Sequence, residues 1–444
     1  MRVLNQILSP LSNTFGDSEK EKERAAWFTC TLLSIIIPFT GSKASHLLRC
    51  LKCVFGFVNI TKRRFYIFMA SPKIPWDRLW KCVWSMIPKP TINGKLFIAL
   101  DDFINPKTGR KIFGCCRFFD HAAKQNQSRY PWSQNVVAIG LLKVVKGRWA
   151  CLPLASRFYH LEKDLKKKPV RVGRKVVEFK TKFDQAVEMI KSVAEHFSNP
   201  IVCITDSWFG NNGLFKPMRD LIGDRFHLLS RLRSNITIYE QPSPKRSRKG
   251  PGRPRKYGKK AGNASDCASR FRRYAKTFHV NLYGGIREIL AYERTIMLET
   301  LKHPVKVVWV FRKKQWVALF STDLSMTLEQ IVEYYGARWK IESGFKELKQ
   351  DLGGNQTQAR DANAVINHLN FCQMAATLVW IYGDLLKKKP HRRHSVKGRG
   401  HFAFSDVRRL LAEVILDENF DKVCPVPRKS MLNSLLAALL RMAA

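Results

Sequence analysis

Two short apolar runs that each end on aspartate most constrain the fold of this chain. Residues 96–100 end on Asp101 and Asp102, and residues 201–205 end on Asp206. Apolar runs of this length predict strands. Because ligands commonly bind at the carboxyl ends of strands in α/β sheets, these aspartates are candidate functional residues.

A third strand and a helix are predicted between these runs. Residues 134–145 are rich in Val, Ile and Leu, and residues 183–196 carry helical periodicity. Strands that alternate with a helix predict an α/β layer. With 444 residues, 45% of them hydrophobic, the chain can bury a sizeable core and is long enough for two to four units.

Composition and periodicity divide the chain into segments. The first is helical, and its short helices form either a DNA-binding unit or a helical cap on the core. A stretch of strict alternation after residue 235 predicts an antiparallel β insertion, and helical periodicity resumes at Leu328. We expect a helical region at 1–90, two core segments at 91–235 and 321–390, the β insertion at 236–320, and a basic helical tail at 391–444.

The charge balance favours a polyanionic partner. Lys and Arg number 78 against 35 Asp and Glu, a net charge of +43, and cations that meet phosphates release condensed counterions and so strengthen binding. An anionic membrane surface is the competing partner, but the apolar residues are spread along the chain and do not form one amphipathic stripe. We expect nucleic acid and no membrane. The odd count of 11 Cys is typical of reduced thiols, so we expect a cytoplasmic, nucleoid-associated protein.

A basic loop lies inside the predicted insertion. Residues 245–260 hold nine Lys or Arg and no acid, interspersed with Pro and Gly that break strands and helices. Around Arg253, Arg255 and Lys256 the sequence resembles the core of an AT-hook, which lies in the narrow minor groove of A·T-rich DNA. The loop is interpreted as a DNA contact, with a solvated linker as the alternative.

A helix at 335–349 presents a mixed face. At about 100° per residue, Tyr335, Arg338, Glu342 and Lys349 fall within an arc of about 60°. By spacing alone this face is more typical of a solvated stripe of salt bridges. Two aspartates at strand ends elsewhere favour a site, because carboxylate oxygens suit Mg²⁺ or Mn²⁺.

These four residues reproduce the Y-x2-R-x3-E-x6-K signature of insertion-sequence transposases with a DDE triad, which the chain resembles over residues 91–385. Residues 98–102, followed by 107–111, resemble the first-Asp motif of that family, and residues 204–207 resemble the second. The spacings also agree: 206 − 102 = 104 residues separate the aspartates, and 342 − 206 = 136 separate the second from the glutamate.

The resemblance implies a ribonuclease H-like core, a mixed sheet flanked by helices, interrupted by the β insertion. It also implies that Asp102, Asp206 and Glu342 bind two Mg²⁺ or Mn²⁺ ions for phosphodiester chemistry. Asp101 is the rival of Asp102. Adjacent strand residues point to opposite faces, so only one of them faces the site, and the place in the motif favours Asp102.

The resemblance further implies that Tyr335, Arg338 and Lys349 contact the transposon-end backbone. Trp316 lies where some members of the family hold a flipped base against an aromatic ring. Burial in the β insertion is the alternative for Trp316, and Trp309 is a weaker candidate for the same role.

The predicted function is a DNA transposase for cut-and-paste transposition of an insertion sequence. Its partners are double-stranded DNA at the terminal inverted repeats and at the target, and cutting both ends in one complex requires at least a homodimer. The alternative is a catalytically inactive, transposase-derived DNA-binding protein. A structural RNA-binding protein explains the charge but not the three carboxylates.

Overall fold

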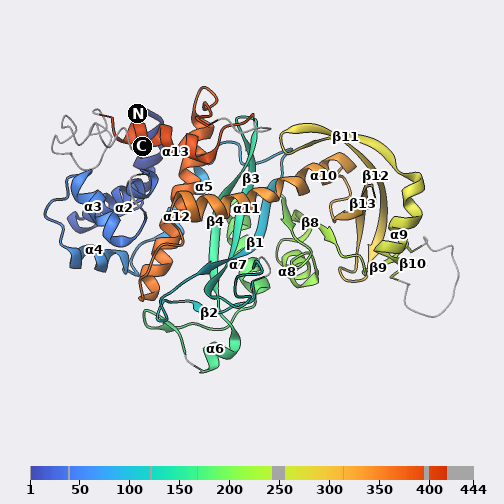
Figure 1. The fold of residues 1–444 in the computed structure, drawn as a ribbon, viewed down its shortest axis with the longest axis horizontal. Helices are drawn as coiled ribbons and strands as arrows, with labels where there is room; N and C mark the ends of the chain where they lie inside the picture. The colour runs from blue at the N-terminus through green and yellow to red at the C-terminus, as the bar shows by residue number, and fades with distance from the viewer. Residues whose placement is uncertain are drawn as a thin grey trace.

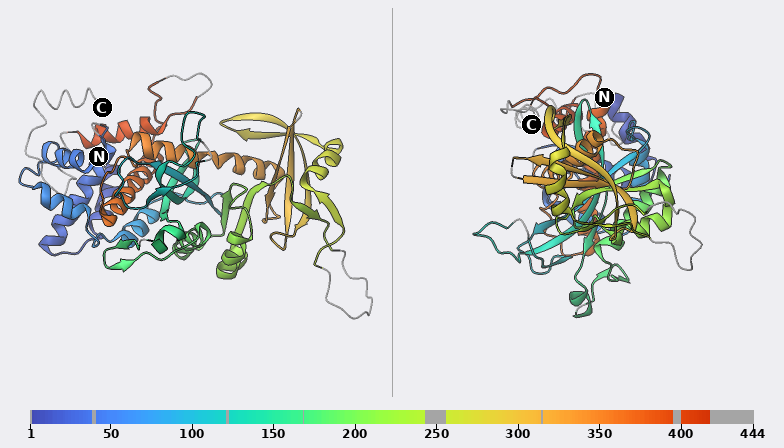
Figure 2. Two further views of the ribbon diagram at one scale, coloured as in Figure 1. Left: turned by 60° about the horizontal axis from the view of Figure 1, so that its bottom comes forward. Right: turned by 90° about the vertical axis from the view of Figure 1, so that its right-hand side faces the viewer.

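One sheet of twelve strands runs through the molecule (Figure 1). The computed structural model describes residues 2–38, 41–120, 123–167, 169–242, 256–313, 315–394 and 400–417. A helical lobe lies at one end of the elongated chain and a β-rich lobe at the other, with the middle of the sheet between them (Figures 1 and 2).

The core part of the sheet has the order β4-β3-β1-β7-β8, and β2 pairs with the start of β3 on the same edge as β4. β1 pairs antiparallel with β3 and parallel with β7, and β7 pairs parallel with β8. The predicted mixed sheet flanked by helices is therefore confirmed. The strands are β1 (Leu96–Pro106), β2 (Cys115–Arg117), β3 (Trp132–Val145), β4 (Arg148–Tyr159), β7 (Ile201–Thr205) and β8 (Phe226–Leu232), with a separate hairpin of β5 (Arg171–Val172) and β6 (Lys175–Val176).

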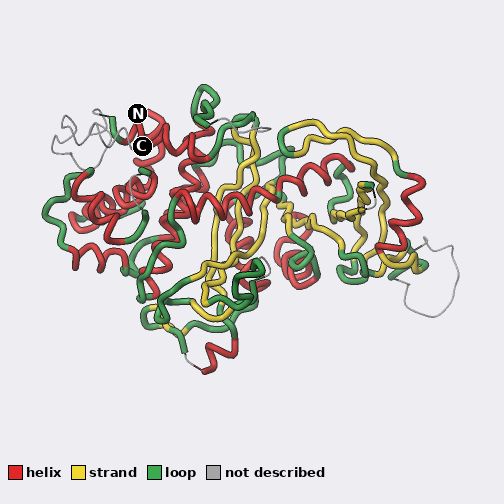
Figure 3. The backbone as a smooth tube through the Cα atoms, viewed as in Figure 1, coloured by secondary structure: helices red, strands yellow, loops and turns green. Residues whose placement is uncertain are grey.

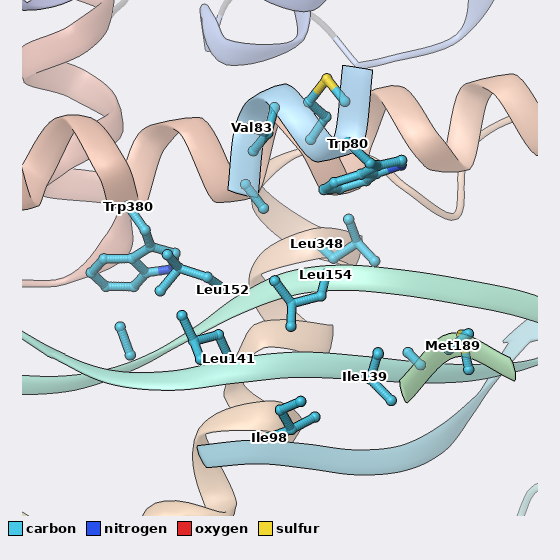
Figure 4. Close-up of a cluster of buried hydrophobic side chains, with 14 of the residues drawn as sticks. Trp80, Val83, Ile98, Ile139, Leu141, Leu152, Leu154, Met189, Leu348 and Trp380 are labelled. Carbon is cyan, nitrogen blue, oxygen red and sulfur yellow. The ribbon is translucent and has the colours of Figure 1, made fainter. Parts of the chain in front are cut away.

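Helices cover both faces of this core. Ile98, Ile139, Leu141 and Met189 belong to one buried cluster that joins the strands to α7 (Figure 4). On the other face, the ring centroids of Phe97 and Tyr334 of α10 lie 4.4 Å apart. Apolar residues on both faces explain why 96–100 reads as a continuous apolar run. The core helices are α6 (Glu162–Lys167), α7 (Lys182–His196), α8 (Asn212–Ile222), α10 (Leu328–Ala337) and α11 (Trp339–Lys346).

The β insertion extends the core sheet. β14 pairs antiparallel with β8, and β13, β12, β9 and β10 follow outward, with β11 also on β12. Strands occupy the segment that strict alternation predicted to be antiparallel β (Figure 3). The elements are β9 (Thr237–Tyr239), β10 (Lys260–Asn263), α9 (Ala264–Phe271), β11 (Lys276–Leu282), β12 (Gly285–Leu298), β13 (His303–Arg312) and β14 (Gln315–Ser321).

The helical lobe forms around one apolar helix, α12, which packs against α1, α2, α4, α5 and α13. By length and composition α12 is able to cross a membrane, but 83% of its apolar window is buried inside the protein, as in the core helix of a folded domain. Arg408 of α13 donates hydrogen bonds to the carbonyls of Ile35, Ile36 and Ile37 at the end of α2, which otherwise lack helical partners. The helices are α1 (Arg2–Ser12), α2 (Glu19–Ile36), α3 (Ala44–Cys53), α4 (Lys62–Met69), α5 (Trp76–Ser85), α12 (Ala362–Leu385) and α13 (Phe404–Ile415).

Candidate active site

Asp101 lies on the face of β1 that α10 and α11 cover. Side chains alternate along a strand, so Asp101 shares the face of Phe97, whose ring contacts Tyr334. Arg338, between α10 and α11, donates a hydrogen bond of 3.0 Å from Nη1 to Asp101 Oδ2. Although the sequence predicted that the strand ends here, β1 continues to Pro106.

Asp206 lies level with Asp101, immediately after the end of the neighbouring strand β7. Leu100 pairs with Thr205 in the parallel ladder of β1 and β7, so the two aspartates are the next residues along adjacent strands. β7 ends at Thr205, as predicted. Asp206 Oδ1 accepts hydrogen bonds from the backbone N–H groups of Trp208 and Phe209, each 3.0 Å long, which fix the carboxylate at the start of the turn.

Glu342 meets the same arginine from α11. Arg338 Nη2 donates to Glu342 Oε1 at 3.0 Å, so one guanidinium joins Glu342 to Asp101. Arg338 is 8% exposed, and its Nε has no hydrogen-bond acceptor among the residues that the structure describes. Arg338 therefore links Asp101 to Glu342, and Asp206 is close enough for its charge to act on the same guanidinium.

Burial and mutual repulsion perturb the acids of this cluster. Burial raises the pKa of Asp101 to about 7; Arg338 opposes the rise and the negative charge of Asp206 adds to it. Burial also raises the pKa of Glu342, again against the effect of Arg338. Acids with strongly raised pKa values next to a specific charge partner are typical of functional sites.

The sequence favoured Asp102 over Asp101 as the aspartate that faces the site, but the structure places Asp102 on the other face of β1. Asp102 points to the opposite face of β1, where its Oδ2 accepts hydrogen bonds from Asn135 Nδ2 at 2.9 Å and Lys182 Nζ at 2.8 Å. Lys182 is the first residue of α7, whose start is fixed by a capping box between Thr181 and Asp184. Because successive strand residues alternate between faces, Asp102 is not brought together with Asp206 and Glu342.

The signature residues do not share one continuous helical face. The helix tightens at Arg338, whose N–H bonds to the carbonyl of Tyr335, and it passes into a π-helix, η3 (Glu347–Asp351). Tyr335 stays in the cluster, with the Arg338 guanidinium 5.8 Å from its ring centroid, and burial raises the pKa of its hydroxyl. Lys349 lies in the π-helix and donates instead to the carbonyl of Ile104 at 2.8 Å.

The candidates in the insertion differ in their placement. Trp316 is partly buried against the main core, opposite Phe311 in the hairpin of β13 and β14. Trp309 is fully buried. Lys256 is exposed, while the predicted contacts Arg253 and Arg255 lie outside the described residues.

Arg231 is a cation of this site that the sequence did not reveal. Thr205 pairs with Ser230 in the parallel ladder of β7 and β8, so Arg231 follows at the level of Asp206. Arg231 is exposed and close enough to Tyr335 to lower the pKa of its hydroxyl. Its signal was weak, because a single Arg in an apolar strand is also an ordinary solvated residue.

The donor set fits hard divalent cations. Three carboxylates supply the oxygen ligands that Mg²⁺ and Mn²⁺ prefer, and two of them, Asp101 and Glu342, already pair with the cation of Arg338. Within the described ranges, no three Asp, Glu, His or Cys side chains lie close enough to hold one ion.

Comparison with known proteins gives one family. A family model described as DDE superfamily endonuclease matches residues 11–288, which is 288 − 11 + 1 = 278 of the 444 residues. The match includes Asp101 and Asp206 and ends before Glu342. It agrees with the ribonuclease H-like architecture expected for the mixed sheet. No curated protein matches the chain.

Proposed function

Because this chain belongs to the DDE superfamily endonucleases, we propose that it is a DNA transposase that cuts transposon ends and joins them to target DNA. The observation that carries the proposal is the arrangement of Asp101, Asp206 and Glu342 around Arg338. The proposed first ligand is Asp101, since Asp102 faces α7.

The roles of the side chains follow from their chemistry. Asp101, Asp206 and Glu342 would hold the metal, preferably two Mg²⁺ or Mn²⁺ ions. When bound there, the ions would supply Lewis-acid stabilisation of the attacking and the leaving oxygens in an in-line displacement. Arg338 presents a planar fork that binds phosphate through two parallel hydrogen bonds, and Tyr335 contacts it. These two residues would orient the scissile phosphate.

The proposed substrate and assembly follow from charge and geometry. A net charge of +43 favours binding to the DNA backbone. Cutting two transposon ends in one complex calls for two active sites, so the proposed assembly on DNA is a homodimer. Exposed Lys256 and the rest of the basic loop 245–260 would contact DNA outside the site.

The decisive experiment replaces Glu342 by Gln. DNA that flanks the coding region supplies the terminal repeats for a nicking assay with Mg²⁺ and for gel shifts. Glu342→Gln is expected to lose cleavage and retain end binding, whereas Glu195→Gln, at a side chain 59% exposed on α7, is expected to retain both. Unchanged cleavage by Glu342→Gln would overturn the proposal.

A catalytically inactive DNA-binding protein is the second candidate. It is favoured by the separation of the carboxylates, which form no metal-sized group within the described parts of the chain. The same two assays separate the candidates. Binding of the ends by the wild-type protein, without nicking at any Mg²⁺ or Mn²⁺ concentration, would support this second function.

A further inference from the structure

The turn that follows Asp206 exposes a tryptophan that the proposed chemistry does not use. Trp208 is 42% exposed, although large aromatic side chains are usually well buried. Its backbone N–H binds the carboxylate of Asp206 at 3.0 Å. The indole is therefore tied to the same short turn as a proposed metal ligand.

The start of α7 holds this indole in one orientation. The ring of Trp208 stacks on Phe183, with centroids 4.9 Å apart and planes inclined by 9°. Lys182 Nζ lies 5.4 Å from the Trp208 ring centroid and 5.3 Å from that of Tyr159. Asp102 in turn fixes Lys182 through their ion pair of 2.8 Å.

This arrangement combines the two features that recognise a nucleotide. A fixed aromatic surface stacks on a nucleobase, and Lys182, whose charge Asp102 partly balances, lies beside the ring as a hydrogen-bond donor for the phosphate. Because the ring is already oriented, little conformational freedom is lost on binding. Bases within a duplex stack on one another and hide their faces, so the chemistry fits an unpaired nucleotide.

The position of the turn connects this surface to the cleavage site. Asp101 faces α11 and Asp102 faces α7, while Asp206 and Trp208 belong to one turn at the end of β7. We propose that Trp208 and Lys182 bind one unpaired nucleotide of the DNA strand beside the scissile phosphate. The placement beside a scissile phosphate rests on the proposed function, but the nucleotide site itself does not.

The test compares two DNAs on the full-length protein in the absence of divalent metal, so that nothing is cleaved. One is a blunt duplex, and the other has the same duplex with a five-thymidine overhang. Trp208→Ala is expected to weaken binding of the overhang DNA by roughly 5- to 150-fold, the range for loss of one base–aromatic stack. Binding of the blunt duplex is expected to change by less than about twofold, because duplex binding depends mainly on phosphate contacts.

Two variants guard the interpretation. Trp208→Phe keeps an aromatic ring and is expected to restore most of the affinity for the overhang. Unchanged binding of the blunt duplex by Trp208→Ala shows that this variant is folded. Tyr274→Ala removes an aromatic residue that is 52% exposed in the insertion and is expected to affect neither DNA. An equal effect of Trp208→Ala on both DNAs, or none on either, overturns the proposal.

The outcome is independent of catalysis. Failure of the Glu342 cleavage test would leave a selective loss of overhang binding measurable, and an active nuclease without that selectivity would contradict the nucleotide site alone. Lys182→Gln is expected to weaken overhang binding and to reduce the slope of its salt dependence by about one. An unchanged slope contradicts the phosphate contact assigned to Lys182.

Discussion

Exchanging Asp101 and Asp102 separately for Asn distinguishes the two adjacent aspartates. Asp101→Asn is expected to slow DNA cleavage about 10³-fold or more, since a loss of about 4 kcal/mol of metal-based stabilisation corresponds to that factor. Asp102→Asn is expected to keep the rate within about tenfold. It weakens the partly exposed ion pair with Lys182, at a cost of about 1 kcal/mol in the free energy of unfolding.

Asp101→Asn also changes how stability depends on pH. Burial raises the pKa of Asp101 from 3.8 to about 7, so between these pH values the metal-free folded protein holds a proton that the unfolded chain has released. The free energy of unfolding therefore falls as pH rises through this window. A pKa difference of about 3 corresponds to about 4 kcal/mol at most, with partial solvent exposure reducing it.

The two variants therefore have opposite signatures. With a chelator present, thermal unfolding of wild type and Asp102→Asn is expected to shift to lower temperature between about pH 4 and pH 7, whereas Asp101→Asn lacks this contribution and is the more stable protein above about pH 7. Plasmid nicking with Mg²⁺ measures the rates. Loss of cleavage in Asp102→Asn with full activity in Asp101→Asn would refute the assignment, and an unaltered pH profile of Asp101→Asn would refute the electrostatic reasoning.

Three other substitutions probe the contacts around the site and the helical lobe. Arg338→Gln leaves Asp101 and Glu342 without their shared cation; calorimetry is expected to show tighter Mn²⁺ binding, with stability lower by about 3–5 kcal/mol, and equal metal affinity would contradict this. Lys349→Met removes the bond to the Ile104 carbonyl and is expected to cost about 1 kcal/mol while leaving the salt dependence of DNA binding unchanged; a smaller salt slope would restore the predicted DNA contact. Arg408→Met removes the partners of three buried carbonyls and is expected to lower the melting temperature through a loss of about 2–3 kcal/mol, which an unchanged calorimetric transition would disprove.

The sequence was sufficient where a pattern is local. The strand that precedes Asp206 was predicted with its observed bounds, since four apolar residues and a β-branched threonine are followed at once by a polar turn. The helix at 183–196 begins only one residue earlier, at Lys182. Helical periodicity likewise predicted a helix that begins at Leu328, and the structure divides this segment into α10 and α11, which meet at Arg338.

The choice between Asp101 and Asp102 was beyond the sequence for a physical reason. β1 is buried on both faces, so Phe97, Ile98, Ala99 and Leu100 are all apolar and give no alternation from which to read the faces. Pairing with β7 and packing against α10 decide it. These contacts join residues more than a hundred positions apart.

The sequence analysis missed the orientation of Lys349 and the ion pair between Lys182 and Asp102 for related reasons. A helical wheel assumes one uniform helix, whereas a π-helix at 347–351 changes the direction of Lys349. Lys182 showed no motif, because its partner Asp102 is distant in sequence. For Trp208, an aromatic residue two positions after Asp206 was the available signal.

The pairing of β14 with β8 fixes the position of the β insertion relative to the catalytic core. Four residue pairs, from Ala318 with Leu232 to Ser321 with Leu229, join the insertion to the strand beside Asp206. Swinging the insertion as a free domain would break main-chain hydrogen bonds that are costly to leave unpaired. If the insertion binds DNA as proposed above, that DNA would reach the carboxylates at a set distance, and the pairing of β8 with β14 would fix the spacing between the bound sequence and the cut.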